Sequence, residues 1–144
     1  MKNTSFFFFS LLSAAILVAC GKDAAPADTG PTAYQLVIPT GLPIMPIPPG
    51  NPLTVEGVAL GRKLFYDPIL SGDNSMACAD CHLQKDAFTD IRQFSRGING
   101  DEGARNAMPL FNLGWQKKFF WDGRSSSLEQ QALRPIQDPI EMHE

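Results

Sequence analysis

The chain has 144 residues, of which 44% are hydrophobic, and its 12 basic and 15 acidic side chains give a formal charge of −3. This balance leaves no basic stripe that could collect phosphates, which argues against a nucleic acid as partner. The length limits the chain to one small domain.

The first 20 residues, MKNTSFFFFSLLSAAILVAC, have the layout of an export signal, in which a basic residue precedes an apolar run too short to span a membrane. The end of the run resembles the bacterial lipoprotein cleavage box, in which Cys20 becomes the lipidated first residue of the mature chain. The alternative is an ordinary signal with an incidental cysteine. Gly21 stands at the second position of the mature chain in place of an aspartate, which resembles lipoproteins that are sorted to the outer membrane. We therefore expect a signal peptide at residues 1–19. We also expect a periplasmic protein that is anchored to a membrane by lipid on Cys20, and Gly21 predicts that this is the outer membrane.

Residues 20–33 are small and polar, which indicates a flexible tether between the lipid and the domain. Residues 34–52 contain six prolines, too many for a helix or a central strand, so we expect this segment to lie extended along the surface. The domain itself is expected to occupy residues 53–144.

The first helix of the domain is predicted over VEGVALGRKLFYD. Thr54 is its N-cap, Glu56 places a negative charge in its first turn, and Pro68 ends it near Asp67. After a cysteine-rich motif, the polar and glycine-rich residues 84–105 predict a loop with one short turn at most.

A second helix is predicted over SSLEQQALRP. Ser126 and Glu129 form a capping box at its start, and the helix is expected to stop before Pro135. Asp138 and Glu141 offer another capping box, which predicts that the chain ends within the first turn of a further helix.

The stretch MACADCHLQ places Cys78, Cys81 and His82 at the spacing C-x-x-C-H. An exported pair of cysteines must be a redox-active disulfide or be covalently occupied, and Cys20 is assigned to lipid. A zinc site lacks ligands, because the only other histidine is His143, and a thioredoxin-like site lacks its strand and helix pattern. On one helical turn both sulfurs and the imidazole can meet the same ring. The motif therefore predicts one covalent haem c with His82 as the axial ligand of the iron.

Five blocks between residues 51 and 144 follow one another in the order NPLTVEGVALGRKLFYDPILS, CADCH, RNAMPLFN, FFWDGRSSSLEQQA and PIQDPIEM. Together they resemble the N-terminal haem domain of the bacterial di-haem cytochrome c peroxidases and their MauG-type relatives. The resemblance implies an all-α, cytochrome c-like fold with long loops, whose haem reacts with hydrogen peroxide. It also implies a second haem domain that delivers electrons, so the chain is expected to be a fragment or a truncated form.

The resemblance also implies roles for single residues. It makes His82 the proximal ligand and Glu141 the distal carboxylate that can move the proton of peroxide. It makes Trp121 the electron relay between the two haems, places Pro135 in the distal pocket, and gives Asn106 to a calcium site of the intact protein. The structural alternatives are a core tryptophan, a turn asparagine and a capping glutamate.

Arg105 and Arg124 are candidates for contacts with the haem propionates, although a solvated arginine is the alternative. The loop FSRGINGDEGARN has no histidine, whereas relatives that need reductive activation carry one there, so we expect an iron that is open without activation. Met108 stands where the family usually has proline. Its thioether is a candidate sixth ligand, with a loop or core methionine as the alternative.

The function predicted for the intact protein is the reduction of hydrogen peroxide, with electrons from the second haem or from a small partner cytochrome or cupredoxin. Two alternatives remain open: a membrane-anchored mono-haem electron carrier, and a MauG-type oxidation of a protein substrate.

Overall fold

The computed structural model describes residues 30–144, so the predicted signal peptide, Cys20 and most of the tether lie outside the described residues. In the described part, backbone pairing between extended segments is limited to isolated antiparallel bridges, and no strand forms. No helix of residues 30–144 is long and apolar enough to cross a membrane. The helical elements are α1 (Val55–Tyr66), η1 (Pro68–Leu70), α2 (Cys78–Cys81), η2 (Gln84–Asp86), η3 (Leu113–Trp115) and α3 (Leu128–Gln137).

The first helix, α1, begins and ends where its sequence predicts. The Thr54 hydroxyl accepts a hydrogen bond from the Gly57 amide at 3.0 Å, and Asp67 takes the C-cap position before Pro68. The ring of Phe65 packs edge-on against Phe88, with 6.1 Å between the ring centroids. This contact joins α1 to the loop that follows α2.

The predicted boundaries of the last helix, α3, were wrong at both ends. Its N-cap is Ser127, whose hydroxyl accepts from the Gln130 amide at 3.2 Å, so the cap lies one residue later than the expected Ser126 and Glu129. The helix also continues to Gln137, past Pro135. Proline has a helical φ and costs only one intrahelical hydrogen bond near a helix end, which this helix tolerates.

The expected helix after Asp138 does not form within the described chain. Residues 138–142 make turns, and the Asp138 carboxylate accepts from the Ile140 amide at 2.9 Å. The chain folds back on α3, because the Met142 amide donates to the Pro135 carbonyl and the Glu144 amide to the Ile136 carbonyl.

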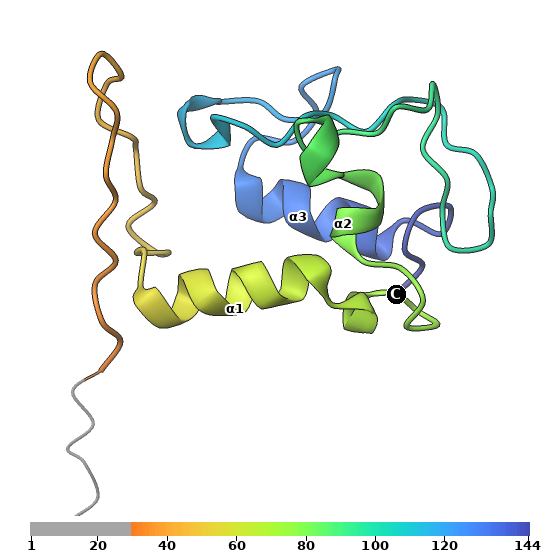
Figure 1. Ribbon diagram of the computed structural model, residues 1–144, viewed down its shortest axis with the longest axis horizontal. Helices are drawn as coiled ribbons and strands as arrows, with labels where there is room; N and C mark the ends of the chain where they lie inside the picture. Colours follow the sequence, from red (N-terminus) through yellow and green to blue (C-terminus); the bar gives the residue numbers. More distant parts are fainter. Residues whose placement is uncertain (1–29) are drawn as a thin grey trace, which may run out of the picture.

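Residues 34–52 contain no helix or strand. They start and end beside the N-terminus of α1, where the Tyr34 amide donates to the Leu53 carbonyl at 3.0 Å (Figure 1). The far part of this loop lies against η3, where the Trp115 indole donates to the Pro43 carbonyl at 2.9 Å.

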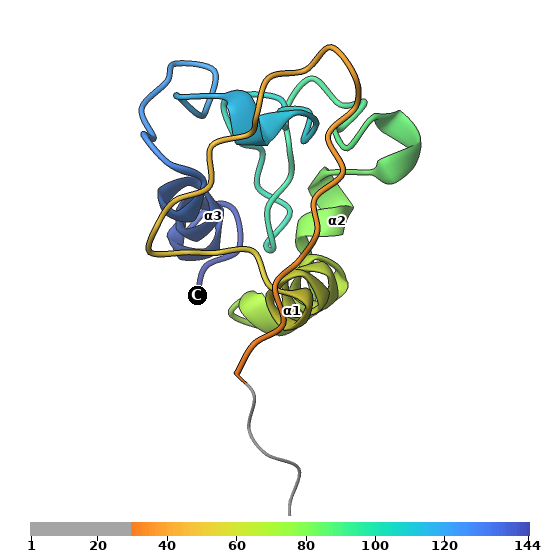
Figure 2. The same cartoon turned by 90° about the vertical axis from the view of Figure 1, so that its left-hand side faces the viewer.

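Residues 95–105 form a β-hairpin-like loop, named the 95–105 hairpin. The hairpin is closed by hydrogen bonds between Ser95 and Arg105 and between Gly97 and Asp101. In the view of Figure 2 it falls between α2 and α3, and Figure 1 shows that it extends to the right of α1 and α2. Its Ile98 amide donates to the Glu141 carbonyl, so this short loop contacts a segment that is distant in the sequence.

Candidate functional site

The C-x-x-C-H motif folds as one helical turn. The Asp80 carboxylate accepts from the Ala77 amide at 2.8 Å, and the His82 amide donates to the Cys78 carbonyl at 3.0 Å. Cys78 and Cys81 are half-buried and are not joined in a disulfide. Burial raises the pKa of the Cys78 thiol and raises that of Cys81 to about 11.

These raised pKa values fit a thiol pair that is inert until it is modified, because reactive and metal-binding cysteines have lowered ones. No group of three or more potential metal-ligating side chains occurs in residues 30–144. Two sulfurs and one imidazole on a single turn fit a c-type haem.

The imidazole of His82 is oriented by a backbone carbonyl. Its Nδ1 lies 3.0 Å from the carbonyl oxygen of Phe88, which holds the proton on Nδ1 and leaves Nε2 as the ligand atom. Ala87 and Phe88 both have a left-handed φ of 58°, and this tight turn directs the carbonyl back at the ring. Burial lowers the pKa of His82, which favours the neutral, ligating form. The backbone of Met108 also lies against this ring.

An ion pair that the sequence did not reveal supports the loop around His82. Asp90 is only 4% exposed, and its carboxylate accepts from Nη2 of Arg92 at 2.6 Å and from Nε at 2.8 Å. The Arg92 guanidinium holds the pKa of Asp90 below its ordinary value. The side-chain amide of Asn106 donates to the backbone carbonyls of both residues.

Glu141 lies on the same side of the molecule as the cysteines, although 60 positions separate it from Cys81. Its charge contributes to the raised pKa of the Cys81 thiol, so the two groups lie within the range of an electrostatic interaction. Burial raises the pKa of Glu141, the Asp138 carboxylate raises it further, and Arg124 lowers it. Glu141 and Arg124 line one small cavity of about 220 Å³.

Both arginines proposed from the sequence bind the same carboxylate. Arg105 lies 2.9 Å and Arg124 3.1 Å from Oδ2 of Asp122. The Arg124 guanidinium also stacks on Phe120, 3.3 Å from the ring centroid. The Asp122 carboxylate thus forms ion pairs with both arginines, and each arginine side chain is about half exposed.

Trp121 is 61% exposed, so it is not a core residue of the described chain. Its indole Nε1 donates to the Asn106 carbonyl at 2.9 Å, which fixes the ring at the surface. The Asn106 side chain accepts from the Thr89 hydroxyl at 3.2 Å and donates to the carbonyls of Asp90 and Arg92. In this structure it therefore links its own loop to residues 89–92.

Sequence reasoning missed Gln131. Its amide oxygen is buried and has no hydrogen-bond partner among the described residues. Since Gln131 stands four residues before Pro135, both lie on one face of α3, and this i, i+4 spacing is the signal that could have found it. A buried, unpaired carbonyl oxygen is costly and is available to a donor brought by a ligand.

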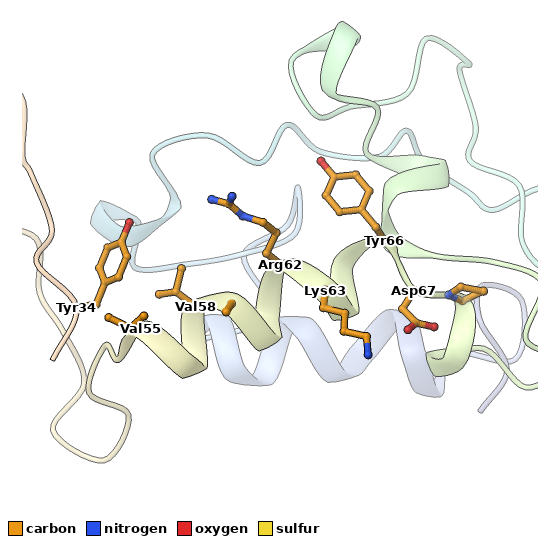
Figure 3. Close-up of a pocket in the computed structure, with 9 residues that line it drawn as sticks. Tyr34, Val55, Val58, Arg62, Lys63, Tyr66 and Asp67 are labelled. Carbon is orange, nitrogen blue, oxygen red and sulfur yellow. The ribbon is translucent and has the colours of Figure 1, made fainter. Parts of the chain in front are cut away.

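The outer face of α1 carries an open groove that is separate from this site. Figure 3 shows Tyr34 and Tyr66 at its two ends, with Val58 and Arg62 between them. None of the three motif residues lines it.

Residues 55–144 match the family of di-haem cytochrome c peroxidases. The chain belongs to this family. The haem motif, the turn that holds Glu141 and the Asp122 network all lie within the matched residues.

Relatives of the family agree with this assignment. The chain is 40% identical to the cytochrome-c peroxidase IdrP1 of Pseudomonas sp. (strain SCT) over 92% of its own length and 33% of that protein. It is 44% identical to the methylamine utilization protein MauG of Methylorubrum extorquens over 69% of its length and 28% of that protein. The crystal structure of a MauG-like protein associated with microbial copper homeostasis is similar, with a TM-score of 0.71 and 41% identity over 76% of this chain and 32% of that one. The chain thus spans about a third of the length of these relatives.

Proposed function

We propose that the chain is the peroxide-reacting haem domain of a di-haem cytochrome c peroxidase. Cys78 and Cys81 would hold one haem c by thioether bonds, and His82 would bind its iron. The single observation that carries this proposal is the turn that presents both sulfurs beside an imidazole whose Nδ1 is already engaged by Phe88. When bound, the haem would supply the iron at which peroxide reacts, and a second haem or a donor protein would deliver the electrons.

Glu141 performs the proton transfer in this proposal. Reduction of hydrogen peroxide to two water molecules consumes two electrons and two protons, and breaking the O–O bond requires a proton on the leaving oxygen. A half-buried carboxylate with a raised pKa can take the proton from one oxygen and return it to the other. Pro135 lies on the same face of α3 as Gln131, and in this proposal it borders the pocket in which Glu141 acts.

The remaining residues serve electron transfer and cofactor binding. Trp121, exposed and oriented by its indole hydrogen bond, is positioned to relay electrons from a second haem domain. A guanidinium has five donors, so pairing with Asp122 leaves N–H groups on Arg105 and Arg124 for a haem propionate. Asn106 would contribute to a calcium site of the intact protein only by losing some of its hydrogen bonds to residues 89–92.

The alternative of an electron carrier with Met108 on the iron is less well supported. The Met108 backbone lies close to the ring of His82, which would be the proximal ligand, and this position of the backbone assigns no role at the iron to the Met108 thioether. The other alternative, a MauG-type oxidation of a protein substrate, uses the same peroxide chemistry and is favoured by the 44% identity to a MauG protein.

We place the protein in the periplasm, attached by lipid on Cys20 through the tether of residues 20–33. The donor of electrons is then a small cytochrome or cupredoxin of that compartment. Residues 34–52 lie between the tether and the haem domain of residues 53–144.

The test uses full-length holoprotein made in a host that attaches c-type haem. Replacing Glu141 by glutamine preserves its size and removes the proton shuttle, so peroxide should still bind while O–O cleavage slows by a factor on the order of 10² to 10⁴. Stopped-flow absorbance of the haem measures both steps. Glu129→Gln, an exposed carboxylate hydrogen-bonded to Asn51, is the control. An unchanged cleavage rate in Glu141→Gln would reduce Glu141 to a structural residue, and a parent protein that does not bind peroxide would favour the electron carrier.

A further inference from the structure

The peptide that carries Glu141 is held by backbone contacts from two distant loops. On one side, the Ile98 amide of the 95–105 hairpin donates to the Glu141 carbonyl at 2.8 Å. The preceding Gly97 packs so closely that a Cβ there would lie 1.5 Å from the Ile140 carbonyl oxygen. Gly97 does not have a positive φ, so the reason for glycine is space and not backbone conformation.

The second contact comes from the loop after η1. The Gly72 amide donates to the Met142 carbonyl at 2.9 Å, and a Cβ on Gly72 would lie 2.4 Å from the His143 carbonyl oxygen. Met142 itself is only 5% exposed. Two consecutive carbonyls, those of Glu141 and Met142, are therefore fixed by two different loops, each at a glycine contact.

The 95–105 hairpin also reaches the haem motif. The carbonyl oxygen of Arg96 lies 3.7 Å from Sγ of Cys81, while the next two residues contact the peptides of Ile140 and Glu141. Three consecutive residues thus bridge the cysteine turn and the glutamate turn (Figure 2). A short hairpin closed by its own hydrogen bonds is a rigid way to fix this separation.

We propose that the 95–105 hairpin is a spacer that sets the distance of the Glu141 carboxylate from the haem-bearing turn, with Gly97 and Gly72 as positioning residues. The inference rests on the proposed role of Glu141. Proton transfer in a site of this kind requires placement within about 0.5 Å, and a displacement of about 1 Å costs on the order of 10²-fold in rate. A methyl group at position 97 displaces the Ile140 carbonyl by more than that, since non-bonded atoms prefer separations of roughly 3.5 Å.

The main test compares Gly97→Ala with Gly103→Ala in full-length holoprotein. Gly103 lies in the same hairpin and likewise lacks a positive φ, but a Cβ there would make an ordinary 3.5 Å contact with the Ser95 carbonyl. Gly97→Ala should slow O–O cleavage on the order of 10²-fold with little change in the peroxide concentration needed for saturation. Gly103→Ala should leave the rate within about twofold of the parent.

Hydrogen exchange supplies a readout that does not depend on activity. The Ile98 amide should exchange faster in Gly97→Ala, because its hydrogen bond to the Glu141 carbonyl is broken, and should remain protected in Gly103→Ala. An Ile98 amide that stays protected in Gly97→Ala, with an unchanged cleavage rate, would overturn the proposal.

A double variant separates this inference from the proposed function. If Gly97 acts through Glu141, then Gly97→Ala/Glu141→Gln should be no slower than Glu141→Gln alone, because the positioned group is already gone. Additive losses would contradict positioning and indicate a separate structural effect. If Glu141→Gln has no effect by itself, the proposed function fails, whatever Gly97→Ala does.

Gly72→Ala gives a second arm if Gly97→Ala does not fold. Its contact of 2.4 Å demands a smaller displacement, so we expect a fall in the cleavage rate on the order of tenfold, again absent on the Glu141→Gln background. Gly50→Ala is its control, because a Cβ at Gly50 would meet nothing within 4 Å. A Gly72→Ala protein with the parental cleavage rate would refute the role of Gly72 in positioning Glu141.

Discussion

Replacing Asp90 by asparagine tests the buried ion pair that supports the loop beside His82. The asparagine side chain has nearly the same size, and its carbonyl oxygen can still accept one hydrogen bond from Arg92. Its NH₂ group, however, must face the guanidinium where Oδ2 of Asp90 accepts from Nη2 at 2.6 Å and Nε at 2.8 Å. The variant therefore places donor against donor at a position that is almost closed to water.

The magnitude follows from the burial of the two partners. Breaking a fully buried pair costs about 3–5 kcal/mol, and one hydrogen bond to a charged group contributes about 1.5–3 kcal/mol. The Arg92 side chain is 41% exposed and can regain water, which reduces the loss. We expect Asp90→Asn to lower the free energy of unfolding by about 2–3 kcal/mol, which corresponds to about 10 °C in Tm for a chain of this size.

The stability difference between the parent and Asp90→Asn should depend on pH in one direction. Arg92 holds the pKa of Asp90 below its ordinary value, so the pair stabilises the folded protein above the unfolded pKa, about 3.9, and loses this contribution as the pH falls through the folded pKa. The difference in stability between the parent and Asp90→Asn should thus be constant near neutral pH and shrink below about pH 4.

Urea unfolding of the holoprotein, followed by far-UV circular dichroism at several pH values, measures this difference. The control is Glu102→Gln, which removes an exposed pair in which both side chains are more than half accessible. The control should change stability by less than about 1 kcal/mol. An Asp90→Asn protein as stable as the parent, or a stability gap that widens in acid, would refute the assignment of a stabilising buried pair.

Three further predictions concern the haem and its reaction. Cys81→Ala should still retain haem covalently through Cys78 after acid-acetone extraction, whereas replacing both cysteines should abolish the covalent haem mass in mass spectrometry. Arg124→Gln should move the acidic limb of the pH profile for O–O cleavage to higher pH, because Arg124 lowers the pKa of Glu141 and the base form is lost below that pKa; an unmoved limb in stopped-flow experiments would contradict this. Trp121→Phe in the full-length protein should slow electron delivery between haems, seen in single-turnover absorbance, and leave peroxide binding unchanged.

The fold was predictable where local chemistry decides it. α1 was predicted correctly because the Thr54 cap and Pro68 act within a few residues of the helix ends. The start of α3 was missed by one residue, since three successive serines can each cap a helix. Ser125 is fully buried and bridges to Phe119, which removes it as a cap. The Ser126 amide donates to the Gln130 side chain, and the cap falls to Ser127.

The site was predictable only in its sequence-local part. The C-x-x-C-H turn is visible because its residues are adjacent, and the structure winds them as expected. Asp90 and Gly97 were not found, because nothing in their neighbouring residues distinguishes them. Gln131 could have been found only through its i, i+4 spacing to Pro135. Their significance lies in burial, in an unpaired oxygen and in a close approach to Ile140, and all three depend on segments distant in sequence.

Two of the buried apolar side chains lie in the same turns as the residues proposed for haem binding and proton transfer. Among residues 30–144 the buried apolar side chains are Ala77, Phe119 and Met142. Ala77 immediately precedes the first cysteine of the haem motif, and Met142 immediately follows Glu141, so two of the best-packed positions are direct neighbours of the groups that we assign to haem and peroxide. A side chain locked by packing fixes the backbone of the residue beside it, and preorganised groups act without reorganising during the reaction. Changes that loosen the turn at Met142 should therefore affect stability and proton transfer together, whereas loss of the Asp90 pair should act on the loop beside His82 and leave the Glu141 turn in place.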